Sequence, residues 1–417
     1  MITSHQVTDA DLGQFCTLYS ECYPGMKTNS PEEFARLEAR LRSSLDDSRF
    51  TMHGLWEGDR LVAGMRYHSY TMNCFGHSVL CGGAAVVAVR LDSKKRGLAK
   101  RLMSDYLEHY RSQGAVFAAL YAFRPDFYYD MGFGYGAPTW VFSVAPKDIP
   151  RPAARPNVRL LTVKDVPTLH RSFNGYVHKH SGAFEETELY LAIGYESQPE
   201  VKYAAVFEGE EIIGYIKFKF EQANPTNFVC TDIRIIDLVC DDRTALGHLF
   251  SFLHNQHDQI RRVLFTTYDE QLYSAFRDVR DGSDNMTAIV THQMCTGGMG
   301  IMYRVINTHA LFETLRDHNF GNESLTLKID ATDTFLPANN QSLVIRFAGG
   351  YPTIVESTSA DVAITLSVAD FSSLILGAVK FDRLYKYGKA EISEVSRVDQ
   401  ITHLFASSEK PICLSRF

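Results

Sequence analysis

The stretch that decides the fold of the first part of this chain runs over residues 86–102. It reads Val86-Val87-Ala88-Val89-Arg90-Leu91-Asp92-Ser93-Lys94-Lys95-Arg96-Gly97-Leu98-Ala99-Lys100-Arg101-Leu102. Its first residues are apolar and mostly β-branched, which is typical of a buried strand. Three consecutive cations and a glycine follow, and from Leu98 large apolar residues recur every four positions, as on one face of a helix. We therefore expect a strand, a charged turn and a helix over residues 98–113.

The junction between the turn and the helix predicts an anion site. The first backbone N–H groups of a helix have no partner within the helix and carry partial positive charge. Gly97 and Ala99 add little bulk, so an anion can approach these groups. The cations nearby are Lys94, Lys95, Arg96 and Lys100. This combination favours a cradle for a pyrophosphate, and the alternative is a solvated basic loop before an ordinary amphipathic helix.

A second motif, Phe127-Tyr128-Tyr129-Asp130-Met131-Gly132-Phe133, follows after the next expected strand, over residues 117–122. At this point a family resemblance can be stated. Lys94-x-x-Gly97-x-Ala99 resembles the Q/R-x-x-G-x-G/A motif of the GNAT acetyltransferases, with Lys94 in place of Gln or Arg. Phe127-Tyr128 with Met131-Gly132-Phe133 resembles the aromatic segment of the same superfamily, and the separation of the two motifs also fits.

The resemblance implies that acetyl-CoA is the co-substrate and that Tyr128 is the general acid that protonates the leaving thiolate. A phenol has a free pKa near 10 and a thiol one near 8.5, so this proton transfer is mildly uphill unless the site tunes it. Tyr129 and Tyr135 are interpreted as packed aromatics. The residues expected to bind acetyl-CoA are Val87, Ala88, Val89, Lys94, Lys95, Arg96, Gly97, Leu98, Ala99, Lys100, Phe123 and Arg124.

The remainder of the chain repeats part of this pattern. Four prolines between residues 146 and 156 indicate a linker. The strand-and-helix opening and the hairpin of residues 50–71 then return at residues 158–166 and 202–220, which indicates an internal duplication. In the second copy Asp241 and Asp242 stand where a phosphate loop needs cations, so we expect one cofactor site. We predict a GNAT domain over residues 1–150, a degenerate GNAT-like domain over 151–300 and a third, α+β domain over 301–417.

This layout resembles the Eis (enhanced intracellular survival) family, whose C-terminal domain is similar to sterol carrier proteins. The resemblance implies an α/β (α+β) fold, transfer of acetyl to a primary amine of a small cationic, aminoglycoside-like substrate, and a homohexamer. It also implies that the carboxylate of the C-terminal Phe417 is the general base; the alternative is a frayed tail. Arg416 stands where some relatives carry an acid, so we expect weak aminoglycoside activity. Other candidate acids are Asp126, Glu185, Glu186 and Glu188.

Composition excludes several other classes of function. The 417-residue chain has a formal net charge of −7 and a pI near 6.1, unlike a nucleic-acid binder. It shows no signal peptide and no run of about 18 apolar residues, so we expect a cytoplasmic protein that does not bind membranes. Its eight cysteines are interpreted as reduced thiols. Histidines 178, 180, 254 and 257 lack the ligand spacing of a metal site, so we expect no metal.

Two alternatives for the activity stay open. The acceptor could be a protein or peptide lysine or a polyamine instead of a small aminoglycoside-like amine. The chain could also be a non-catalytic lipid- or ligand-binding protein that keeps an acetyltransferase fold.

Overall fold

The computed structural model describes residues 1–25, 28, 30–45 and 47–417. The described chain forms two compact units. The first contains residues 1–136, 301–411 and 416–417, and the second contains residues 137–300 and 412–415. The first unit carries the segments in which the sequence predicts the active site.

The first unit contains a seven-stranded sheet in the order β1-β2-β3-β4-β5-β16-β6. All neighbouring strands are antiparallel except β4 and β5, which run parallel. The strands are β1 (Ile2–Gln6), β2 (Phe50–Glu57), β3 (Arg60–Cys74), β4 (His77–Val89), β5 (Phe117–Leu120), β16 (Met302–Val305) and β6 (Gly134–Tyr135). The expected strand, charged turn and helix are all present, with α3 (Leu98–Ser112) after the turn.

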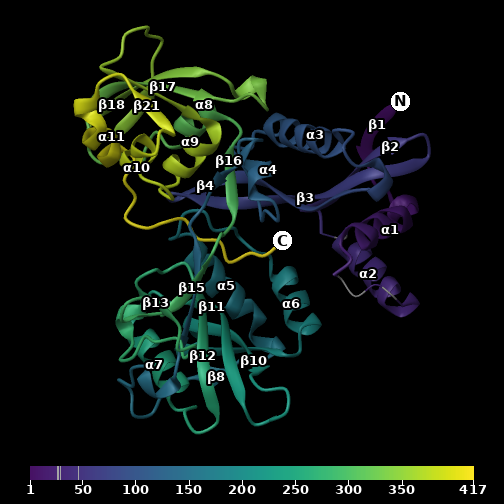
Figure 1. Ribbon diagram of the computed structural model, residues 1–417, viewed down its shortest axis with the longest axis vertical. Helices are drawn as coiled ribbons and strands as arrows, with labels where there is room; N and C mark the ends of the chain where they lie inside the picture. The colour runs from purple at the N-terminus through teal and green to yellow at the C-terminus, as the bar shows by residue number, and fades with distance from the viewer. Residues whose placement is uncertain (26–27, 29, 46) are drawn as a thin grey trace. The chain divides into compact units, whose positions relative to one another are not determined.

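Helices cover both faces of this sheet (Figure 1). α1 (Leu12–Cys22) and α2 (Pro31–Ser44) pack with Trp56, Leu61 and Ala88 on one face. α3 packs with Leu55 and Val62 on the other face. Strand neighbours such as Leu61 and Val62 thus point to opposite faces, as the two-residue period of a strand requires. The α3 side chains expected to form its apolar face, Leu98, Leu102, Tyr106 and Tyr110, are all buried.

The second unit repeats the sheet of the first. Its order is β8-β9-β10-β11-β12-β7-β15, and the one parallel pair is β11 with β12. The strands are β8 (Arg159–Leu160), β9 (Val201–Glu208), β10 (Glu211–Gln222), β11 (Thr231–Val239), β12 (Ile260–Thr267), β7 (Thr139–Val144) and β15 (Cys295–Gly298). The helices are α5 (Val166–Val177), α6 (Glu188–Ser197) and α7 (Arg243–His254), and a separate hairpin joins β13 (Met286–Ala288) to β14 (Thr291–His292).

The two sheets exchange one strand each. β7 follows the first sheet's β6 in the chain but pairs between β12 and β15 of the second sheet. β16 follows β15 but pairs between β5 and β6 of the first sheet. The predicted duplication is therefore confirmed, and each copy contains a strand from the sequence of the other. The boundaries at residues 150 and 300 stay predictions.

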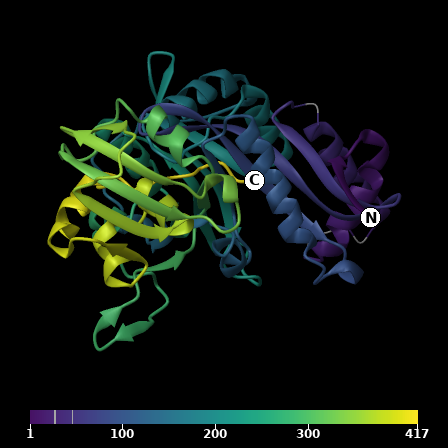
Figure 2. The same cartoon turned by 90° about the horizontal axis from the view of Figure 1, so that it is seen from above.

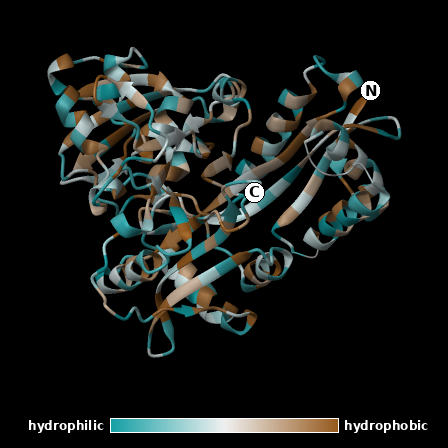
Figure 3. Ribbon diagram, turned by 60° about the horizontal axis from the view of Figure 1, so that its bottom comes forward, coloured by the Kyte–Doolittle hydropathy of each residue, from teal (hydrophilic) through white to brown (hydrophobic). Residues whose placement is uncertain are grey.

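The C-terminal part of the first unit adds a five-stranded sheet in the order β19-β18-β17-β20-β21. Figure 2 shows its strands in green and yellow with the last helices beside them. The strands are β17 (Leu325–Thr332), β18 (Ser342–Ala348), β19 (Tyr351–Ile354), β20 (Val362–Ser367) and β21 (Ala390–Ile392). The helices are α8 (Thr308–Thr314), α9 (Val368–Ile375), α10 (Phe381–Lys386) and α11 (Val398–Leu404). The α+β architecture expected for the third domain is confirmed. In Figure 3 hydrophobic colour is concentrated along the strands, whereas many connecting loops are hydrophilic.

Candidate active site

The candidate site begins where β4 separates from β5. The two strands pair from Cys81 to Ala84 only, while β4 continues to Val89. Beyond Ala85 the pairing of β4 with β3 slips by one residue, and Val86 takes a φ of +54°. A β-branched residue in the left-handed region is a genuine outlier, and here it marks a β-bulge. The bulge bends β4 and leaves one edge of its last residues without a strand partner.

Backbone groups of Val87 and Val89 face this open edge. The Arg90 N–H donates to the Val62 carbonyl of β3, and Ala88 pairs opposite Gly64. Because backbone groups alternate along an antiparallel strand, those of Val87 and Val89 point away from β3. Their carbonyls accept from the Tyr23 hydroxyl at 3.0 Å and the Cys22 thiol at 3.1 Å, respectively. Of the three strand residues expected to bind acetyl-CoA, Ala88 therefore has its backbone turned toward β3.

The start of α3 has the features that the sequence predicts for an anion site. Gly97 is the N-cap residue with φ +78°, and no side chain caps the helix. Among the described residues, no ion pair involves Lys94, Lys95 or Lys100, and all three are exposed. The first amides of α3 and these lysines are thus available to an anionic group from solvent.

Arg96 differs from its lysine neighbours. Its guanidinium forms a two-pronged ion pair with Glu57 at the end of β2, with N–O distances of 2.8 and 3.1 Å. This pairing neutralises one of the four cations that the sequence places at the loop. No local motif predicts this pairing, because Glu57 lies 39 positions before Arg96 in the chain.

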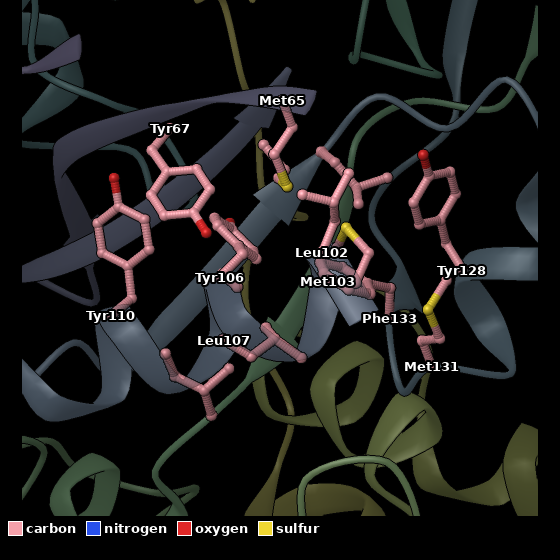
Figure 4. Close-up of a cluster of buried hydrophobic side chains, with 14 of the residues drawn as sticks. Met65, Tyr67, Leu102, Met103, Tyr106, Leu107, Tyr110, Tyr128, Met131 and Phe133 are labelled. Atoms are coloured by element: carbon pink, nitrogen blue, oxygen red, sulfur yellow. The ribbon is translucent and has the colours of Figure 1, made fainter. Parts of the chain in front are cut away.

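Tyr128 lies on α4 (Pro125–Tyr129), a helix of a single turn. Its side chain is only 2 % exposed and forms one end of the cluster that lies beneath α3 (Figure 4). Burial, and to a smaller extent the nearby Tyr23 hydroxyl, raises the pKa of Tyr128 above that of a free phenol. Within the described part of the chain its hydroxyl makes no hydrogen bond. Tyr128 is therefore a protonated phenol at neutral pH with a proton available to donate.

Phe123 and Arg124 lie at the start of the same segment. The Phe123 side chain is 68 % exposed and its ring centroid lies 6.2 Å from that of Tyr128. Arg124 pairs with Asp126 at 2.5 Å. Asp126, one of the candidate acids, is thus already neutralised by a neighbour. The other three candidates belong to the second unit, where Glu185 contacts His178 at 2.8 Å.

The ring of Phe417 packs in an aromatic box of the first sheet. Its centroid lies 5.2 Å from His68, 5.1 Å from Tyr70 and 5.5 Å from Tyr121. Gly83 forms the floor of this box, because an added Cβ would lie 3.0 Å from the Phe417 ring. Phe417 therefore packs beside β3 and β4, and its role as the general base stays a prediction.

Two side chains of the box, His68 and Tyr70, belong to a chain of hydrogen bonds that begins at Arg66. Arg66 Nε donates to His68 Nε2 at 2.7 Å, and His68 Nδ1 lies 2.9 Å from the Tyr70 hydroxyl. Burial, with Arg66 and Arg49 nearby, lowers the pKa of His68 well below its ordinary value. His68 is thus neutral and fixed between two partners.

The second sheet contains the corresponding strand and helix without the anion site. At the start of α7 the Asp242 carboxylate accepts from the Ala245 N–H at 2.7 Å, so it occupies an amide that a phosphate would need. The preceding Asp241 contacts His180 at 3.0 Å and Lys179 at 3.3 Å. The sequence prediction that acids replace cations here agrees with this geometry.

Sequence reasoning missed Tyr23, His68 and Tyr70. Tyr23 lies between α1 and α2, far from either motif in the chain. The two β3 residues belong to an aromatic-rich strand whose pattern favours a core strand. The one available signal was their spacing, His68-x-Tyr70, which places both side chains on one face of β3.

Comparisons with known proteins agree with this geometry. Family models of a GNAT acetyltransferase domain match residues 3–136 and 175–305, and a sterol carrier protein domain model matches residues 309–414. The chain contains two GNAT acetyltransferase domains. GNAT domains use acetyl-CoA as co-substrate. The open edge of β4 and the start of α3 both lie within the first matched domain. No curated protein matches the chain in sequence.

Solved structures share the whole fold of this GNAT protein. A GCN5-related N-acetyltransferase from Anabaena variabilis and a probable N-acyltransferase from Enterococcus faecalis each superpose with a TM-score of 0.80 at 15% identity, covering 100% of both chains. Eis1 from Mycobacterium abscessus superposes with a TM-score of 0.77 at 16% identity, again over 100% of both chains. The predicted order of two GNAT domains and a sterol-carrier-like domain is confirmed.

Two searches of the described residues bear on other classes of site. No group of three or more His, Cys, Asp or Glu side chains in residues 1–25, 28, 30–45 and 47–417 is placed to hold a metal ion. None of the helices in those same ranges combines the length and apolar character needed to cross a bilayer.

Proposed function

We propose that this GNAT protein transfers acetyl from acetyl-CoA to a primary amine of a small cationic substrate, by direct attack and with an Eis-like arrangement. The observation that carries the proposal is the open edge of β4, which lies between an uncapped, lysine-flanked helix start and a buried tyrosine. The second sheet, where Asp242 caps the equivalent helix, lacks this combination. Hence one of the two GNAT copies binds acetyl-CoA.

The roles of the residues follow from their positions. The amides of Lys95 to Lys100 hold the pyrophosphate. The backbone of Val87 and Val89 pairs with the pantetheine arm once the Tyr23 hydroxyl and the Cys22 thiol no longer bond to the carbonyls of these two residues. The Val87 amide polarises the thioester carbonyl, where negative charge develops in the transition state. Phe123, exposed beside Tyr128, contacts the cofactor from the opposite side.

The chemistry needs one acid and one base. The amine lone pair attacks the acetyl carbonyl carbon, the carbon–sulfur bond breaks, and the thiolate takes the Tyr128 hydroxyl proton. The carboxylate of Phe417 accepts the proton that the amine loses, directly or through water. Because burial keeps Tyr128 protonated, the acid is in its active form over the whole neutral range.

The choice of acceptor depends on the charge beside the proposed base. Arg416 beside the proposed base disfavours polycationic aminoglycosides, and a lysine of a protein or peptide or a polyamine is the alternative acceptor. Acetyl transfer to a panel that contains one member of each class separates them. Assembly as a hexamer belongs to the same proposal and is tested by light scattering of the full chain.

The decisive experiment compares Tyr128→Phe with Tyr135→Phe. Tyr135 stacks on Tyr129 and is partly exposed, so Tyr135→Phe, which removes only a hydroxyl, is a matched control. We expect Tyr128→Phe to lower kcat by about 10²- to 10⁴-fold while acetyl-CoA still raises the melting temperature. Full turnover in Tyr128→Phe would show that Tyr128 is not the general acid. No thermal shift of the wild-type protein with acetyl-CoA would favour the non-catalytic lipid- or ligand-binding alternative.

A further inference from the structure

The helix that carries Tyr128 is attached to the C-terminal part of the first unit through its next residue. The Tyr129 hydroxyl donates to both carboxylate oxygens of Asp370, each at 2.8 Å. The two residues are 241 positions apart in the chain. Successive residues of a helix point about 100° apart, so Tyr128 enters the cluster beneath α3 while Tyr129 contacts α9.

Asp370 is itself held rigidly. Its side chain lies in the first turn of α9, where the Ser367 hydroxyl donates to Asp370 Oδ2 at 2.7 Å and accepts from the Asp370 N–H at 3.1 Å. Asp370 is 7 % exposed, and all eight residues of α9 are buried. A carboxylate buried in this way accepts strong hydrogen bonds from few donors, and the Tyr129 hydroxyl is one of them.

The backbone after α4 is fitted to the same helix. An added Cβ at Gly132 would lie 2.7 Å from the Val368 side chain and 2.5 Å from Arg304 Nη1. A Cβ at Gly134 would clash with the Ala369 carbonyl of α9. Only glycine permits this approach, and Gly132 also needs its φ of +86°. The turn that ends the Tyr128 helix therefore rests directly on α9.

A buried ion pair fixes the surface beneath this turn. Arg304 of β16 donates to both oxygens of Asp333 at 2.9 Å, and both side chains are fully buried. Such a pair is costly to disrupt once one partner is removed. The Tyr128 helix thus has two rigid supports, α9 through Asp370 and β16 through Arg304, and both come from residues beyond 300.

We propose that Tyr129 and Asp370 are positioning residues for the acid of the acetyl transfer. By fixing α4, the bond from Tyr129 to Asp370 holds the Tyr128 hydroxyl at the open edge of β4, so the sterol-carrier-like domain takes part in catalysis as a support. The inference rests on the proposed role of Tyr128 as the general acid. Displacement of a reacting group by a fraction of an ångström lowers turnover without weakening the binding of distant parts of the substrate.

Three variants test the bond. Tyr129→Phe keeps the ring and its stacking on Tyr135 but removes the donor. Asp370→Leu removes both acceptors, and Asp370→Asn keeps one, so it serves as the conservative variant. We expect Tyr129→Phe and Asp370→Leu each to lower kcat about tenfold with the KM for acetyl-CoA within about twofold. Asp370→Asn retains more activity, and the double variant Tyr129→Phe/Asp370→Leu is no worse than the poorer single variant.

A second measurement detects positioning as distinct from stability. Burial raises the pKa of Tyr128 above that of a free phenol, so kcat of the wild type should not fall up to about pH 10. If α4 loosens, water reaches the phenol, its pKa returns toward that of a free phenol, and kcat falls at alkaline pH in both single variants. Tyr135→Phe is the control, and we expect it to leave kcat and the pH profile unchanged.

The outcomes separate this inference from the proposed function. Full turnover in Tyr128→Phe shows that the acid assignment is wrong. Loss of turnover in Tyr128→Phe together with wild-type kcat and pH profile in Tyr129→Phe overturns the positioning role alone. Multiplied effects in the double variant also overturn it. If Asp370→Leu does not fold, Tyr129→Phe and Asp370→Asn decide the question.

Discussion

Arg66 fixes the tautomer of His68. A guanidinium can only donate, so the 2.7 Å bond from Arg66 Nε requires His68 Nε2 to be an acceptor. The ring is neutral because burial lowers its pKa, so its one proton is on Nδ1 and is donated to the Tyr70 oxygen. The ring against which Phe417 packs therefore has a defined hydrogen-bond direction.

This relationship predicts a spectroscopic result. In protein labelled at histidine, His68 should show a protonated Nδ1 and an unprotonated Nε2, with no titration at the ordinary imidazole pKa near 6.5. Replacement by Arg66→Leu should remove the constraint and produce tautomer exchange at His68. Nitrogen NMR measures both states. A protonated Nε2 in the wild-type protein would contradict the assignment.

The anchoring of Phe417 depends on the absence of a side chain at residue 83. In Gly83→Ala the new methyl would lie 2.9 Å from the Tyr70 ring and 3.0 Å from the Phe417 ring, so the packing of these two rings must change. We expect kcat to fall by on the order of 10²-fold while acetyl-CoA affinity is unchanged. Gly13→Ala, where an added Cβ has open space, is the control. Wild-type kcat in Gly83→Ala, measured at saturating acetyl-CoA, would exclude a precise role for the terminal carboxylate.

The lysines at the start of α3 should contribute to cofactor affinity more than Arg96. We expect Lys95→Gln and Lys100→Gln each to weaken acetyl-CoA binding about two- to tenfold, with a smaller salt dependence than in the wild type. Arg96→Gln should change affinity less, because Glu57 already neutralises that guanidinium. Calorimetric titration at two salt concentrations makes the comparison. A larger loss in Arg96→Gln than in the lysine variants would contradict this model.

Stability of the first unit should fall in mild acid through His53. Its ring is stacked on Tyr67 with centroids 3.9 Å apart, and burial lowers its pKa from 6.5 to about 4. Between these values the unfolded chain binds a proton that the folded chain does not. The contribution of neutral His53 to the free energy of unfolding is therefore complete above pH 6.5. It is lost as the pH falls to about 4, and the loss is up to about 3 kcal/mol.

His53→Phe retains the aromatic stack and cannot be protonated. Its free energy of unfolding, measured by denaturant titration, should fall less between pH 6.5 and 4 than that of the wild type. His68, which is buried and neutral in both proteins, contributes equally to each and cancels in the difference. Equal slopes for the two proteins would show that His53 is accessible to protons when folded.

Local features of the site could be predicted from the sequence. The strand, turn and helix over residues 86–112 follow from hydrophobic period and helix-start chemistry, and both act over a few residues. The acids that replace cations before α7 were visible for the same reason. In each case the predicted structure depends on neighbours in the chain.

Contacts over long stretches of chain were not predictable. The pairing of Arg96 with Glu57, the bond between Tyr129 and Asp370, and the aromatic box around Phe417 join segments with no shared periodicity. The bulge at Val86 was hidden as well, because its β-branched sequence favours a regular strand. These features arise from tertiary packing, which one sequence does not encode in any local pattern.

The placement of β16 between β5 and β6 has a consequence for biosynthesis. Once the first 136 residues have left the ribosome, both segments that we propose bind the cofactor are present, together with Tyr128. The gap in the sheet is filled only when residues 302–305 emerge. Until then the edges of β5 and β6 stay open to wrong partners. A gene fragment that ends after the first copy is thus expected to yield an aggregating product, and the catalytic centre matures late in translation.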